Sequence, residues 1–171
     1  GLQVATQSSN GTHGQWLIDP TDFTIAASGG DMTGSALGGY LASNNITIST
    51  GTGTNTATSY FGASGVGGNI YVNDNVSWSS NNTLTLHADS NIYINKIITS
   101  SGTTGKLALE YGQGAVSAGN TAGFFMGADT SGGFAGQVNL KEGNNFSTKL
   151  GSDGSVVNYT VITRAGNPGD I

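Results

Sequence analysis

The sequence predicts an all-β protein, a right-handed parallel β-helix (a solenoid) of about seven coils with loop insertions. A short phrase, an asparagine followed by apolar, polar and apolar residues, recurs at 45–48, 69–72 and 91–94. The alternation is typical of a strand with one buried face, and strands repeated at a fixed interval indicate a solenoid. The phrases are about 23 residues apart, so a chain of 171 residues has room for about seven coils.

The first series of strands starts at Phe23, and its members begin at Phe23, Ile46, Ile70 and Ile92. The spacing between successive members is nearly constant along the series. Because adjacent strands of a solenoid stack in register, we expect the four side chains to form one continuous apolar spine.

Two further series run out of step with the first. Residues 84–86 and 107–109 are separated by the same interval, and 76–78 lie about one coil before Ile98. Asn73 and Asn95 follow the first-series strands at matching places. Such asparagines either hydrogen-bond to one another along the stack or are present because asparagine tolerates turn dihedrals; the sequence leaves both open.

No helix is expected. The longest candidate, 35–43, is short and has two glycines in its middle, where each glycine costs about 1 kcal/mol relative to alanine. Irregular insertions are predicted near 51–68 and 112–136 within one domain, 1–171. Residues 124–126 (Phe-Phe-Met) of the second insertion are expected to be buried, with a contact patch as the alternative. The strand pattern resumes at 138–140, 146–150 and 159–162.

The composition excludes several classes of protein. Charged residues are 9%, the formal net charge is −5 and the five basic residues do not cluster, so a nucleic-acid partner is not expected. Cysteine is absent, which excludes disulfides and zinc–thiolate sites, and we expect no cofactor and no metal. No apolar run is long enough to span a bilayer, so membrane insertion is not expected. The composition suits export, with any signal upstream of this sequence.

The candidate ligand-binding residues are Tyr71 and Tyr93. Both are outward positions of the first series, and in adjacent parallel strands their rings would lie about 4.8 Å apart and stack. The pair is interpreted as a platform for a sugar ring, with a merely structural pair as the alternative.

An enzyme would need clustered ionisable groups. The most suggestive set is Asp74, Asp89 and Lys96 in neighbouring coils, an arrangement that β-helical polysaccharide lyases and hydrolases use. Both aspartates, however, fall in turns, where aspartate is expected for local hydrogen bonding. His13 and His87 have no triad partner at a recognisable spacing, so we assign no catalytic residue.

Four collinear segments carry a resemblance to a known family. They read WLIDPTDFTI at 16–25, SGGDMTG at 28–34, GNIYVNDNVSWSSNNTLTLHADSNIYINKIITSSG at 68–102 and NFSTKLGSDGSVVNYTVIT at 145–163. The chain resembles the filamentous haemagglutinin-like exoproteins of bacterial two-partner secretion over more than half its length, and 112–136 departs from them.

The resemblance implies a β-helical segment of a long filament that is secreted through an outer-membrane pore and stays on the bacterial cell surface. It supplies no catalytic residues. Only 167–170 (Asn-Pro-Gly-Asp) comes near the Asn-Pro-Asn motif of the secretion domain, so we interpret the chain as an internal piece. The predicted function is a structural and adhesive module, a haemagglutinin-like adhesin mediating cell adhesion, with a host or bacterial surface glycan or protein as partner. The alternative is a carbohydrate-active β-helix enzyme.

Overall fold

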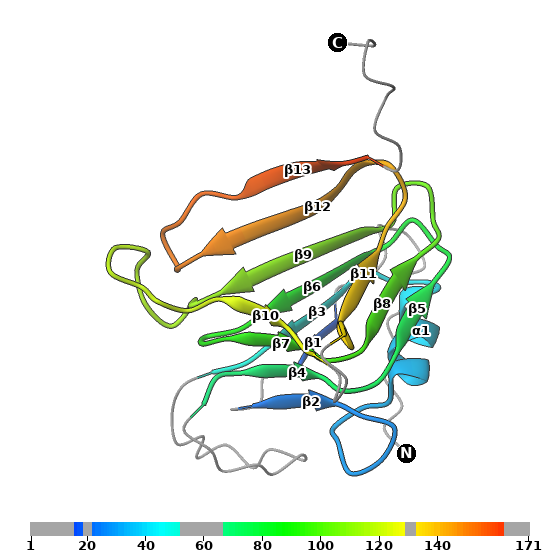
Figure 1. Ribbon diagram of the computed structural model, residues 1–171, viewed down its shortest axis with the longest axis horizontal. Helices are drawn as coiled ribbons and strands as arrows, with labels where there is room; N and C mark the ends of the chain where they lie inside the picture. The colour runs from blue at the N-terminus through cyan, green and yellow to red at the C-terminus, as the bar shows by residue number, and fades with distance from the viewer. Residues whose placement is uncertain (1–15, 19–21, 52–66, 129–132, 163–171) are drawn as a thin grey trace.

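The structure of the protein is a computed structural model that describes residues 16–18, 22–51, 67–128 and 133–162 (Figure 1). Thirteen strands and one helix lie within these ranges. In chain order they are β1 (Trp16–Ile18), β2 (Phe23–Ile25), α1 (Gly34–Leu41), β3 (Ile46–Ser49), β4 (Ile70–Val72), β5 (Val76–Trp78), β6 (Thr83–His87), β7 (Ile92–Ile94), β8 (Ile97–Ser100), β9 (Lys106–Tyr111), β10 (Phe124–Met126), β11 (Gln137–Asn139), β12 (Gly143–Leu150) and β13 (Val157–Val161).

The strands form three sheets. Sheet A has the order β1-β3-β6-β9-β12-β13, sheet B the order β10-β7-β4-β2, and sheet C the order β11-β8-β5. Neighbouring strands run parallel throughout the described sheets, except that β12 and β13 are antiparallel and carry an irregularity in their register.

The expected all-β, right-handed parallel β-helix of about seven coils is wrong. The described residues form a mixed α/β structure with one helix, two parallel sheets and one mixed sheet, and the sheets are not coiled into a single right-handed solenoid. The repeat that predicted the solenoid is regular only within 70–111. There β4, β5 and β6 pair with β7, β8 and β9, in the register Ile70↔Ile92, Val76↔Ile98 and Leu84↔Leu107.

The predicted single spine is also wrong, because Ile46 belongs to another sheet. Phe23, Ile70 and Ile92 are successive register partners in sheet B, as expected. Ile46 instead pairs with Trp16 and Leu84 in sheet A. The step from Phe23 to Ile46 therefore leads from one sheet to another, and spacing alone could not distinguish it from a step within one sheet.

Helix α1 contradicts the expectation that no helix forms. Thr33 caps its start, since the Thr33 hydroxyl accepts a hydrogen bond from the Ala36 N–H at 3.1 Å. Leu37 is fully buried in the core. A Cβ at Gly34 or Gly38 would lie 1.9 or 2.3 Å from a backbone oxygen of the β5 region, so glycine allows the helix to pack directly against that strand.

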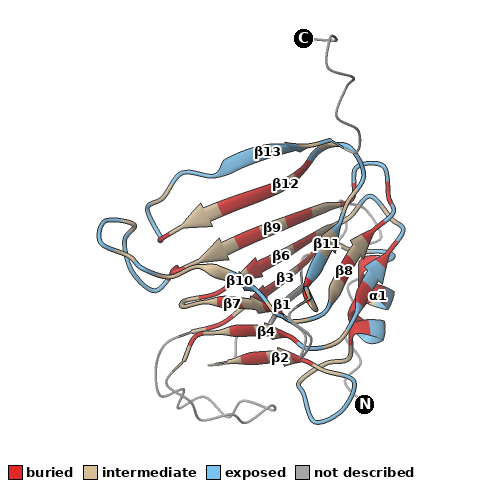
Figure 2. Cartoon of the chain, viewed as in Figure 1, coloured by how far each residue is buried: buried red, intermediate tan, exposed pale blue. Residues whose placement is uncertain are grey.

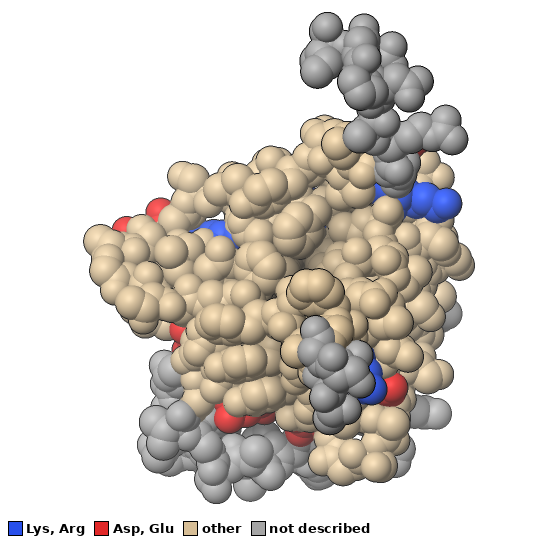
Figure 3. Space-filling model, in the orientation of Figure 1, with Lys and Arg blue, Asp and Glu red and all other residues tan. Residues whose placement is uncertain are grey.

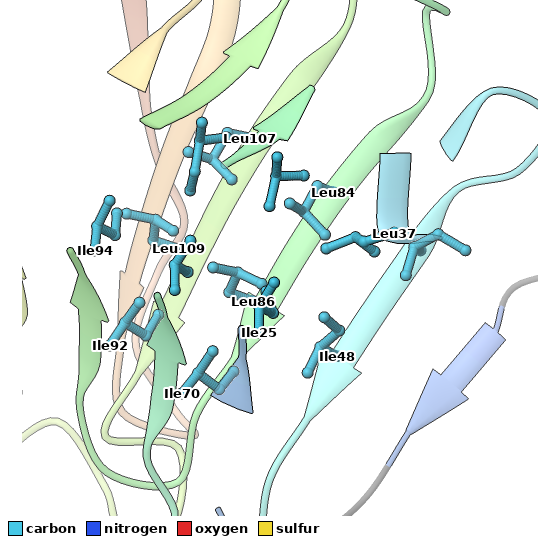
Figure 4. Packing of buried hydrophobic residues seen from close by; sticks show 14 of the residues in the cluster. Ile25, Leu37, Ile48, Ile70, Leu84, Leu86, Ile92, Ile94, Leu107 and Leu109 are labelled. Carbon is cyan, nitrogen blue, oxygen red and sulfur yellow. The ribbon is translucent and has the colours of Figure 1, made fainter. Parts of the chain in front are cut away.

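The core lies where the inner faces of the three sheets and α1 meet (Figures 2 and 4). Strands such as β4 and β7 alternate buried, half-buried and buried residues, so each sends two apolar side chains inward and one outward. Burying such a side chain fully contributes about 1.5–3 kcal/mol, which lets three-residue strands hold their register.

The two predicted insertions have different outcomes. Most of the first lies outside the described residues. In the second, Phe124 packs against the core, but Phe125 and Met126 are 49% and 38% exposed, so the predicted burial of all three is wrong. The reason is that β10 is the last strand of sheet B, and no described strand follows it to cover these side chains.

Candidate functional site

The candidate site is the outer face of sheet B. Because its strands are three residues long, each presents one side chain outward, and the central residues of β2, β4, β7 and β10 are register partners. These residues are Thr24, Tyr71, Tyr93 and Phe125. We call the last three the aromatic row.

The rings of the aromatic row are stacked on one another. The Tyr71 and Tyr93 ring centroids are 5.1 Å apart with an interplanar angle of 7°, and those of Tyr93 and Phe125 are 5.4 Å apart at 21°. The predicted stacking of the two tyrosines is therefore confirmed. Stacked aromatic pairs add about 0.5–1.5 kcal/mol beyond their buried area, so the row also stabilises the short sheet.

Stacking decides which ring face is open. Tyr93 has Tyr71 on one face and Phe125 on the other, so neither of its faces can receive another ring. Phe125 ends the row and has one covered face. A ligand-binding role for Tyr71 and Tyr93 stays a prediction. The sequence analysis considers Phe125 only within 124–126, as buried or as part of a contact patch, and does not predict its place in the row.

Asparagines flank the row on both sides. Asn69 accepts a hydrogen bond from the Asn91 N–H at 3.1 Å, and Asn91 accepts one from the Gly123 N–H at 3.0 Å. On the other side, the Asn95 side-chain amide donates to Asn73 at 2.7 Å. Hydrogen bonding between stacked asparagines, one of the two alternatives left open by the sequence, is thus confirmed.

The flanks change at the last strand. The positions immediately before β4 and β7 are asparagines, whereas the one before β10 is Gly123; the positions immediately after them are asparagines too, whereas Gly127 follows β10. The strand that carries Phe125 is therefore preceded and followed by glycine, where β4 and β7 are preceded and followed by asparagine. Phe125 is 49% exposed, and its ring tip lies over Gly123, where a Cβ would be 3.4 Å from the ring.

The surroundings of Tyr71 favour the neutral form of its hydroxyl. Burial raises the pKa of its hydroxyl above the ordinary value of 10.0, and the charge of Asp22 and the nearby Tyr93 raise it further, against a hydrogen bond with Asn69 that lowers it. Asp22 is itself held in place, because its carboxylate accepts the Asn69 N–H at 2.7 Å.

The structure sets Asp74 and Lys96 at matching places in adjacent strand connections, whereas Asp89 lies at a different connection. Asp74 follows β4, and its two carboxylate oxygens accept the Gly34 and Asn75 N–H groups at 2.8 and 2.9 Å. Asp89 follows β6, at the connection from sheet A to sheet B, whereas Lys96 lies between β7 and β8. Asp74 thus fastens the start of α1 to the sheets, the local role that the sequence allowed for it.

An ion pair on sheet A was missed from the sequence. His87 Nδ1 and a Glu110 carboxylate oxygen lie 2.6 Å apart on adjacent strands. The hydrogen bond with His87 lowers the pKa of Glu110, burial opposes this, and the positive charges of His87 and Lys149 lower it further. The signal was available, since these two residues are separated by the same interval as Leu84 and Leu107.

His13 lies outside the described residues. Asp153 accepts the Ser117 N–H at 2.7 Å, which lowers the pKa of its carboxyl. Within the described ranges no group of three histidine, aspartate or glutamate side chains is placed to hold a metal ion.

Charged side chains are sparse on the face that Figure 3 shows, where they are scattered among uncharged ones. No helix in the described part of the chain is long and apolar enough to cross a bilayer. No family model, curated protein or solved structure matches the chain.

Proposed function

We propose that the protein is a structural and adhesive module of a bacterial surface filament, and that it attaches to a cell-surface glycan by stacking a sugar ring on Phe125. The observation that supports this most is a half-exposed phenylalanine at the end of the aromatic row, with a glycine before and after its strand. Isolated exposed apolar residues are common, but this ring is held in a fixed orientation by Tyr93.

The chemistry of a sugar suits this site. The apolar C–H face of a pyranose packs against an aromatic face, and its hydroxyl groups pair with amides and backbone groups at the edge. The nearby asparagines and the sparse charge fit a neutral glycan better than a strongly charged one. A protein on the host or bacterial cell surface is the alternative partner.

Binding to a glycan array tests the proposal. Phe125→Ala is expected to reduce the array signal at least tenfold, because the ring at the end of the row is removed. Phe134→Ala is the matched control, since Phe134 is 79% exposed but belongs to no ring pair of the row. Equal binding by the two variants, or no binding by the unmodified chain, would contradict the glycan proposal.

Secretion and a place on the bacterial surface follow from the family resemblance together with the low charge and the absence of cysteine. Export through an outer-membrane pore belongs to the same proposal. Antibodies against the chain are expected to label intact producing cells, and labelling only after lysis would count against this location.

The alternative of a carbohydrate-active enzyme is not retained. It depended on Asp74, Asp89 and Lys96 acting together. Both oxygens of Asp74 accept backbone hydrogen bonds, one of which holds the start of α1, and Asp89 lies at a different connection from the other two. No other observation on the described residues favours catalysis.

A further inference from the structure

We propose that β13 is a self-association surface, through which two copies of the chain pair edge to edge and continue sheet A across a two-fold axis. The inference is independent of the glycan site, which lies on the outer face of sheet B. Four observations lead to it.

The first is the position of β13. It is the last strand of sheet A, it runs antiparallel to β12, and no described strand pairs with its outer edge (Figure 1). A two-fold axis beside such an edge places the same strand of a second copy antiparallel to it. That is the simplest closed arrangement for two identical chains.

The second is that β13 itself carries no charge or proline to protect its edge. Edge strands are normally guarded by charges, proline, bulges, short length or a covering segment. Residues 154–162 contain no charged residue and no proline. By contrast, the edge of β2 is covered by its own loop, since the Asp31 N–H donates to the Thr24 carbonyl and the Ala26 N–H to the Met32 carbonyl. The edge strand β5 is covered by α1. The remaining edge strands of sheets B and C, β10 and β11, are only three residues long.

The third is the sequence of the strand, which is nearly palindromic. It reads Val-Asn-Tyr-Thr-Val over 157–161. Antiparallel pairing centred on Tyr159 sets Val157 opposite Val161 of the second copy, Asn158 opposite Thr160, and Tyr159 opposite itself. A two-fold interface requires this reciprocity, and cross-strand valine, hydroxyl–amide and aromatic pairs each stabilise a sheet.

The fourth is an uncovered apolar face. Val157 and Tyr159 are register partners of Thr148 and Phe146, so they lie on the core side of sheet A, yet they are 49% and 44% exposed. Figure 2 shows most of β13 in the colour of exposed residues. Val156 and Ile162, at the two ends, are 51% and 73% exposed. The strip carries no charge of its own, and the Lys106 ammonium reaches β13 only at Asn158, to which it donates at 3.4 Å, on the face opposite to Val157 and Tyr159.

Sedimentation equilibrium over a range of concentrations tests the proposal. The apparent mass of the unmodified chain is expected to rise with concentration from 17.2 kDa towards twice that value. Tyr159→Lys places two ammonium groups opposite each other and is expected to weaken association at least tenfold, whereas Ser43→Lys, which adds the same charge at the exposed end of α1, leaves it unchanged. A chain that stays at its monomer mass at millimolar concentration would overturn the proposal.

Cross-linking tests the register and does not depend on the lysine variant folding. The chain has no cysteine, so one introduced thiol reacts only with its counterpart. A mixture of Val157→Cys and Val161→Cys chains is expected to form mixed disulfide dimers under mild oxidation at least tenfold faster than either variant alone, because only opposite residues reach disulfide distance. Equal rates in the mixture and in the single variants would refute this pairing.

Discussion

Glu110 couples the stability of sheet A to acid pH. Its pKa is lowered in the folded state, mainly by the hydrogen bond with His87. A carboxyl of this kind binds its proton more weakly in the folded chain than in the unfolded one. Its contribution to stability is therefore present above the unfolded pKa and is lost as the pH falls through the folded pKa.

We expect Glu110→Gln to lower the free energy of unfolding at neutral pH by about 0.5–1 kcal/mol, a range that allows for the partial exposure of the pair. Urea unfolding at a series of pH values should show this difference shrinking as the pH drops below 4.5, the ordinary value for the group. Glu142→Gln, at an exposed turn, is the control. Curves for Glu110→Gln and the unmodified chain that remain parallel down to low pH would contradict the assignment.

The sequence predicts only those residues of the aromatic row whose strands repeat at an even interval. Tyr71 and Tyr93 keep the spacing of the strands that carry them, and their stacking follows from that spacing. Phe125 comes later in the chain than one further interval would place it, because the chain makes an excursion before β10, and so its place in the row was hidden. His87 and Glu110 keep the regular spacing of β6 and β9, and that spacing is the signal that predicts their contact.

At the scale of an element, α1 shows tertiary contact overriding propensity. Glycine weakens a helix, which is why 35–43 was not expected to be helical. The pattern could not reveal that Gly34 and Gly38 face the backbone of β5 closely, nor that Leu37 and Leu41 fill the core. The strands were easier to predict because alternation records the burial of each residue directly.

Two glycines of α1 provide a matched pair of substitutions. Gly38→Ala is expected to destabilise the chain by about 1–3 kcal/mol, since the new Cβ would lie 2.3 Å from the Ser77 carbonyl oxygen and overpack the contact. Gly39→Ala meets nothing within 4 Å and is expected to stabilise by up to about 1 kcal/mol through helix propensity. Thermal unfolding of the two variants measures the difference, and a similar shift in both would show that the helix does not pack on β5 in this way.

At the scale of the whole molecule, one cluster of buried side chains runs from β2 to β9 and includes α1. A single continuous core of this kind usually unfolds in one cooperative step. The sheets therefore depend on one another, although among the described strands no sheet is joined to the next by strand pairing.

Ile92→Asp tests this dependence. Ile92 is fully buried between Ile70 and Phe124, so the variant is expected to lose about 4 kcal/mol or more by placing an unpaired charge in the core. Circular dichroism and the fluorescence of the two tryptophans should report the same lowered midpoint. Thr99→Asp, on an outward position of β8, is the control, and an unchanged melting temperature for Ile92→Asp would disprove the register of sheet B.

The sequence predicted the strands and much of their register but not the architecture. The regular stretch 70–111 was extended to the whole chain, and neither the helix after β2 nor the antiparallel return of β13 leaves a trace in the spacing of apolar residues. The number of residues between two strands shows that they repeat, but it does not show whether they join the same sheet.

The hydrogen-bonded asparagines bear on how the protein ages. An asparagine deamidates when its side-chain carbonyl carbon is attacked by the next backbone nitrogen, and this requires the side chain to turn freely. Asn69, Asn75 and Asn91 each hold a backbone N–H of the neighbouring strand, and a bulky residue follows each of them. These amides are therefore expected to stay intact for as long as the strands stay paired.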